Sequence, residues 1–279
     1  MKPTTALGLK KLIAKAERVE AMSLNRPALY LDAVLAQKLA LFRALRRAVA
    51  LKTVRHDQPS GDGMLHHPSA DEVLKFPCPL HGASMGQHMR HSLDHVRKAI
   101  DASLTLHNHN SIEPSHESEP LIVAYDERTR GTSVEEHLVS AEREVGSLRC
   151  CLEEIMQRRG VSVYDLAALP VVVRFAMPPT VMAATTPGRQ EVSTDDALNY
   201  FDVPSNAARE FAFVAHHAIH HNASILAIVR RNEAEIAPGL LSELMELAPD
   251  FGKAPATVLF EKAVKHEAVK DSSRNAPLK

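Results

Sequence analysis

Apolar and helix-forming residues dominate four long stretches of the chain, and they predict four long helices. The expected ranges are 28–50, 84–106, 133–158 and 206–232. Pro27 suits the first turn of the first helix, where its missing N–H costs nothing. Gly160 follows the third stretch, as glycine commonly follows the last turn of a helix. A shorter amphipathic helix is expected over residues 239–248.

Polar residues mark the starts of two of these helices. Ser84 is followed three residues later by Gln87, which is the spacing of a capping box. Ser205 or Asn206 is expected to cap the fourth helix, because both side chains can accept a hydrogen bond from its first turn.

The pattern changes between the third and fourth helices. The β-branched segment Val171–Met177 is bounded by prolines and predicts a short strand or a hairpin with Val181–Ala184. Residues 56–69 and 108–119 are polar with glycine or proline, and predict loops. We therefore expect an all-α fold with a short β-hairpin insertion and extra terminal helices.

The composition describes a chain that can bury a large core and carries almost no net charge. The chain has 279 residues, 45% of them hydrophobic, and a formal net charge of -1. Neither nucleic acid nor an anionic membrane is indicated as a partner. No apolar stretch reaches the roughly eighteen residues of a membrane span, so we expect a soluble protein.

The cysteines and the N-terminal residues of the chain give indications of the cellular compartment. Cys78, Cys150 and Cys151 form no disulfide framework and no paired metal motif, and a reducing compartment fits them best. Residues 1–24 are rich in lysine, with no acid before Glu17. We expect an N-terminal helix in a cytoplasmic protein, with a mitochondrial presequence as the alternative.

Histidine is the compositional outlier, and the fourth helix concentrates it. Side chains four residues apart share a helix face, so His217 and His221 lie about 40° apart around the axis. Glu210 lies on the same face. His216 and His220 point away from it. Two imidazoles one turn apart are typical of a metal-binding pair.

The second helix carries another histidine face. His88, His91 and His95 fall within about 60° of one another, and facing helices can build a metal site from such side chains. Spacing alone does not choose among the three. The alternative is that these histidines are ordinary core or surface residues.

Four ordered motifs resemble the DinB family of metalloenzymes: Ser84–His95, Tyr125–Arg130, Arg209–His221 and Asp250–Thr257. The resemblance implies an up-down-down-up four-helix bundle over residues 25–262, with 1–24 as an extension and 263–279 as a polar tail. It implies a divalent metal ion, Zn, Ni or Fe, held by His91, His217 and His221. Asn222 departs from the pattern, because many relatives carry arginine there.

The resemblance and the ligand chemistry together suggest a metal-dependent enzyme. The expected reaction is hydrolysis or thiol transfer on a small-molecule substrate, with a thiol as one candidate. Glu210 is the candidate general base or hydrogen-bond acceptor for a ligand, and His95 a fourth ligand or a supporting group. The alternative is a non-catalytic metal-binding or structural helical bundle. Whether the subunits form a homodimer is left open.

Overall fold

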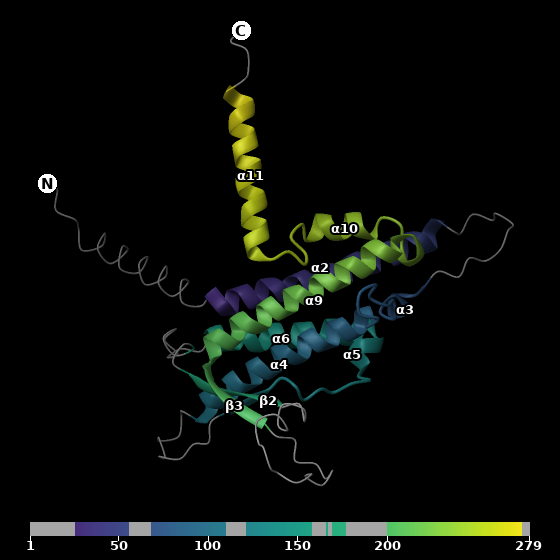
Figure 1. Cartoon of the computed structure of the whole chain (residues 1–279). Coiled ribbons are helices and arrows are strands. Elements are labelled where there is room, and N and C mark those ends of the chain that lie inside the picture. Colours follow the sequence, from purple (N-terminus) through teal and green to yellow (C-terminus); the bar gives the residue numbers. More distant parts are fainter. Residues whose placement is uncertain are drawn as a thin grey trace, which may run out of the picture. The chain divides into compact units, whose positions relative to one another are not determined.

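The computed structural model describes residues 26–55, 68–109, 121–157, 169–176 and 200–274, together with residue 166. These residues form eight helices and one three-stranded sheet (Figure 1). The mostly helical fold predicted from the sequence is confirmed. The expected extension 1–24, the polar loops around 56–67 and 110–119, and the predicted strand at 181–184 lie outside the described residues.

Four long helices coincide with the four predicted stretches. They are α2 (Arg26–Arg55), α4 (Met85–His109), α6 (Leu138–Gln157) and α9 (Ala207–Ile236). Helix α9 has a non-helical residue at Asn232, with φ -115° and ψ 18°, where the sequence predicted the helix to end. The shorter helices are α3 (Ala70–Val73), α5 (Ser133–Glu136), α10 (Leu240–Leu247) and α11 (Pro255–Arg274).

Both predicted helix starts are confirmed. The Ser84 hydroxyl accepts a hydrogen bond from the Gln87 N–H at 3.1 Å, and the Ser84 N–H donates to the Gln87 side chain at 2.9 Å. Of the two candidates for α9, Asn206 makes the cap, because its Oδ1 accepts the Arg209 N–H at 2.9 Å.

The chain divides into two compact units, and each long helix contributes to both. The first unit contains residues 1–33, 93–130 and 144–215, and the second contains 34–92, 131–143 and 216–279. All three strands belong to the first unit: β1 (Leu121–Ala124), β2 (Pro170–Ala176) and β3 (Tyr200–Asn206). Strand β2 pairs with β1 in parallel and with β3 in antiparallel orientation, so β2 is the central strand. Only β2 was anticipated from the sequence.

The core of the second unit includes an apolar stripe on α2. Leu35, Phe42 and Leu45 recur at helical spacing and are fully buried. Phe251, which follows α10 in the chain, is also fully buried. Helix α11 extends to Arg274, through much of the segment expected to be a polar tail.

The third predicted helix is broken in two. His137 has an extended backbone, with φ -124° and ψ 120°, between α5 and α6. The carboxylate of Asp71, from α3, accepts the Leu138 N–H at 2.8 Å and lies 3.1 Å from the His137 ring. A side chain sixty-seven positions away in sequence therefore caps α6, and local periodicity cannot report it.

Replacing Asp71 with alanine should destabilise the protein by about 1 kcal/mol, as loss of a helix cap usually does. The reason is that the Leu138 N–H loses its acceptor. Urea unfolding monitored by circular dichroism measures the change. Asp71→Asn retains an acceptor oxygen and should recover most of the loss, whereas equal losses in both variants would contradict the capping role.

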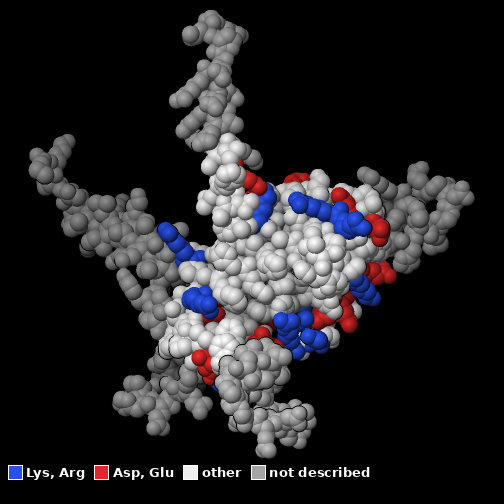
Figure 2. Space-filling model, viewed as in Figure 1, with Lys and Arg blue, Asp and Glu red and all other residues white. Residues whose placement is uncertain are grey.

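Charged side chains of both signs lie next to one another on the face drawn in Figure 2. Arg46 pairs with Glu142 at 2.5 Å and Arg47 with Glu243 at 3.4 Å, both between helices of the second unit. No helix within the described ranges has the length and apolar character needed to cross a membrane.

Candidate metal centre

Helices α4 and α9 bring three histidines together in the second unit. The Nε2 atoms of His91 and His217 lie 3.3 Å apart, although 126 positions separate the residues in sequence. The Nε2 atoms of His217 and His221 lie 3.1 Å apart. One ring nitrogen from each of the three residues lies within 4.8 Å of the other two.

The three rings stand nearly perpendicular to one another. The interplanar angles are 82° for His91 and His217, 86° for His91 and His221, and 78° for His217 and His221. Their centroids lie between 4.6 and 5.1 Å apart. This arrangement is compatible with each ring presenting one nitrogen to a single ion.

The nitrogen spacings fit a metal ion. Two nitrogens bound tetrahedrally at about 2.05 Å from one ion are separated by roughly 3.3 Å. The two Nε2 separations, 3.1 and 3.3 Å, match this value. Three imidazole nitrogens are also a donor set that Zn, Ni and Fe accept. The residues present therefore fit a divalent ion.

Burial favours the uncharged form of His221 and of the neighbouring His88. His221 is buried, whereas His91 and His217 are half-buried. Burial, followed by the charge of His217, lowers the pKa of His221, and burial also lowers the pKa of His88. Metal ligation requires a neutral imidazole, so protons compete weakly for His221 near neutral pH.

The other two histidines of α4 have different surroundings. The Nδ1 atom of His88 lies 2.9 Å from Nδ1 of His221, on the opposite side of that ring from the Nε2 cluster. His95 belongs to the first unit, where its ring stacks on Tyr125 with centroids 4.7 Å apart. Of the three candidates that spacing left open, His91 is therefore the one that joins His217 and His221.

Glu210 also belongs to the first unit, where it is buried and hydrogen-bonded. Its carboxylate accepts hydrogen bonds from Tyr125 at 2.8 Å and from Ser205 at 2.5 Å, and it pairs with Arg209 at 2.5 Å. Burial and the nearby Glu210 carboxylate raise the pKa of Tyr125, so this tyrosine stays protonated and donates. The catalytic role expected of Glu210 stays a prediction.

A buried lysine close to the histidines was missed in the sequence. Lys38 is fully buried, and its Nζ donates to Asn222 Oδ1 at 2.8 Å. Asn222 Nδ2 donates in turn to Gln37 at 3.2 Å. Burial lowers the pKa of Lys38 from 10.5 to about 7. Its position was a usable signal, since Lys38 falls on the stripe of Leu35, Phe42 and Leu45.

Two arginines of α4 are engaged in ion pairs. Arg90 pairs with Glu135 in the interior of the second unit, and Arg97 pairs with Glu144 at 2.8 Å in the first. Arg128 and Arg130 are exposed. Of these four arginines, the exposed pair is therefore the better placed to bind an acidic cofactor or substrate.

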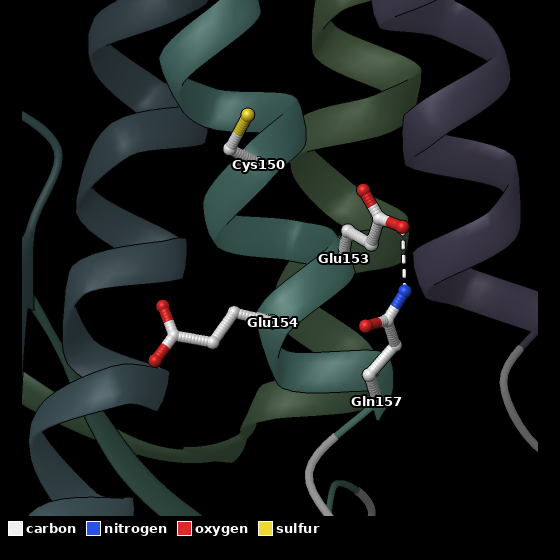
Figure 3. A pocket seen from close by; sticks show the side chains of 4 residues that line it. All are labelled: Cys150, Glu153, Glu154 and Gln157. Carbon is white, nitrogen blue, oxygen red and sulfur yellow. Dashed lines mark hydrogen bonds between the residues drawn. The ribbon is translucent and has the colours of Figure 1, made fainter.

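A separate surface pocket lies on α6 and is lined by Cys150, Glu153, Glu154 and Gln157 (Figure 3). Gln157 donates to Glu153 at 2.5 Å. The Cys150 side chain is exposed. All four side chains come from one helix, so this pocket lacks the converging ligands found among the histidines.

Comparisons of the chain with protein-family models, with curated proteins and with solved structures found no match.

Proposed function

We propose that the chain is a DinB-like metal-dependent enzyme that acts as a hydrolase or thiol transferase. The observation that carries this proposal is the convergence of three histidine Nε2 atoms at ligand spacing. A divalent ion bound there would lower the pKa of a bound water or thiol, and so supply hydroxide or thiolate near neutral pH.

The helix topology that we propose is an up-down-down-up four-helix bundle of α2, α4, α6 and α9. It is supported by the length of these helices, which have 30, 25, 20 and 30 residues. Contacts between them in the second unit also support it. Lys38 of α2 reaches Asn222 of α9, Arg46 of α2 reaches Glu142 of α6, and the histidines join α4 to α9.

Catalysis is favoured over a purely structural ion because the site is only partly enclosed. A structural zinc ion usually has four protein ligands, whereas a catalytic ion has three and one open position. Three histidines form the ligand group found among the described residues, and two of them are half-buried. A small substrate or water therefore has a coordination position to occupy. Glu210 remains the candidate general base within this proposal.

Metal analysis tests the proposal directly. Wild-type protein purified without an affinity tag should contain about one divalent metal ion per chain, measured by plasma mass spectrometry. His91→Ala and His217→Ala should each lose it, because two imidazoles no longer enclose the ion. His216→Ala is the matched control, since His216 is exposed on the same helix. Retention of the metal by both ligand variants would refute the site.

The open position is tested with cobalt. The protein loaded with Co²⁺ should gain a sulfur-to-cobalt charge-transfer band when a small thiol is added, and His217→Ala should not. A cobalt spectrum unchanged by thiol, azide and water exchange would favour the non-catalytic alternative, in which the ion only stabilises the bundle.

A further inference from the structure

His221 has different neighbours at its two ring nitrogens. Its Nε2 lies 3.1 Å from Nε2 of His217, whereas its Nδ1 lies 2.9 Å from Nδ1 of His88. The rings of His88 and His221 are tilted by 47°, with centroids 5.2 Å apart. His88 is almost fully buried, so water does not compete freely for this contact.

The separation of 2.9 Å between two ring nitrogens requires one proton between them. A neutral histidine that binds a metal through Nε2 carries its proton on Nδ1. In the metal-bound protein, His221 Nδ1–H would therefore donate, and His88 Nδ1 would accept. The proton of neutral His88 must then be on its Nε2.

This assignment leaves His88 with a buried donor. Among the described residues, no hydrogen-bond partner lies near its Nε2. A buried polar atom without a partner costs free energy, and an apolar side chain at this position would avoid that cost. The Nδ1 contact with His221 is the interaction that His88 gains in return.

We propose that His88 is a positioning residue for the metal ligand His221. It accepts the Nδ1–H of His221, and so fixes the tautomer and the ring orientation that direct His221 Nε2 toward His91 and His217. This role rests on the proposed metal site. His88 is not itself a ligand, because its Nδ1 faces the far side of the His221 ring. Acceptors of this kind commonly orient metal-bound histidines.

The test compares His88→Leu with His88→Gln, and uses Co²⁺ as the metal. Leucine removes the acceptor, whereas glutamine retains an amide oxygen that can accept the same proton. In competition with a chelator, His88→Leu should bind Co²⁺ roughly 10- to 100-fold more weakly than wild type. His88→Gln should recover most of that affinity. His220→Leu is the control, since His220 also contacts the His221 ring but is exposed.

Proton NMR of the Co²⁺ protein measures the solvent exchange of the imidazole N–H. A change in side-chain packing alone should not alter this exchange. Wild type should show a hyperfine-shifted imidazole N–H that exchanges slowly with solvent, which is His221 Nδ1–H. Exchange should become fast in His88→Leu and stay slow in His88→Gln. If the leucine variant folds poorly, wild type and His88→Gln can still be compared. Slow exchange in both would show that the His221 Nδ1–H is hydrogen-bonded, and fast exchange in wild type would contradict the proposal.

Several outcomes would overturn the positioning role. Wild-type affinity and slow exchange in His88→Leu would show that His221 needs no acceptor. Equal losses of Co²⁺ affinity in His88→Leu and His88→Gln would show that His88 contributes packing and not a hydrogen-bond acceptor. Failure of the proposed metal site is distinguishable from both, because wild type itself would then fail to bind Co²⁺ stoichiometrically.

Discussion

Replacing Lys38 with methionine will stabilise the metal-free protein at pH 6 by roughly 2–4 kcal/mol. Lys38 is fully buried, and burial lowers its pKa from 10.5 to about 7. A shift of this size corresponds to a penalty of about 5 kcal/mol on the ammonium form in the folded state. Methionine removes the penalty but leaves Asn222 Oδ1 without its donor, which costs about 1–3 kcal/mol.

The pH dependence identifies the cause of this gain. Between pH 7 and 10.5 the unfolded wild-type chain holds a proton on Lys38 that the folded chain lacks, so wild-type stability rises with pH. The penalty is fully present below pH 7 and is lost toward pH 10.5. The advantage of Lys38→Met should therefore shrink across this window and reverse near its upper end.

Urea unfolding of chelator-treated protein at intervals from pH 6 to pH 10 measures both effects. Lys75→Met is the matched control, because Lys75 is exposed and its replacement should change stability little at any pH. A stability difference between Lys38→Met and wild type that stays constant from pH 6 to pH 10 would show that Lys38 does not lose its proton in this range.

Replacing Gly86 with alanine will destabilise the protein by more than about 3 kcal/mol, because the new methyl group meets backbone. A Cβ at Gly86 of α4 would lie 2.0 Å from the carbonyl oxygen of Glu135 and 2.8 Å from its carbonyl carbon. Backbone cannot rotate aside, so α4 and α5 would have to separate. The buried ion pair of Arg90 and Glu135 joins the same two helices and would be disturbed as well.

Gly146→Ala provides the control for this prediction. Gly146 lies within α6, and an added Cβ there meets nothing within 4 Å. Alanine favours a helix over glycine by about 1 kcal/mol, so this variant should be as stable as wild type or more stable. Thermal and urea unfolding of the two variants compare them directly. Similar stability of both variants would show that α4 does not pack closely on α5 at Gly86.

The parts of the fold predicted from the sequence are those that depend on neighbouring residues in the chain. The capping box of Ser84 and Gln87 spans three residues, and the pairing of His217 with His221 spans one helical turn. Both could be predicted because helix geometry fixes how side chains at these spacings are placed. The resemblance then selected His91, which periodicity could not separate from His88 and His95.

The parts that were missed depend on contacts between distant segments. The break before α6 requires Asp71 of α3, and β2 is completed by β1 and β3 rather than by a nearby segment. The contact between His88 and His221 joins residues 133 positions apart. Lys38 is different, because its place on an apolar stripe depends on neighbouring residues alone and is visible in the sequence.

The separation of His91 and His217 along the chain has a consequence for folding as well as for chemistry. An ion held by both would close a loop of 126 positions. A cross-link of that length removes much of the conformational freedom of the unfolded chain, as a disulfide would, provided that the ligands stay bound. Unlike a disulfide, it would be released by a chelator rather than by a reductant. Metal supply would then set how readily this chain unfolds and meets proteases.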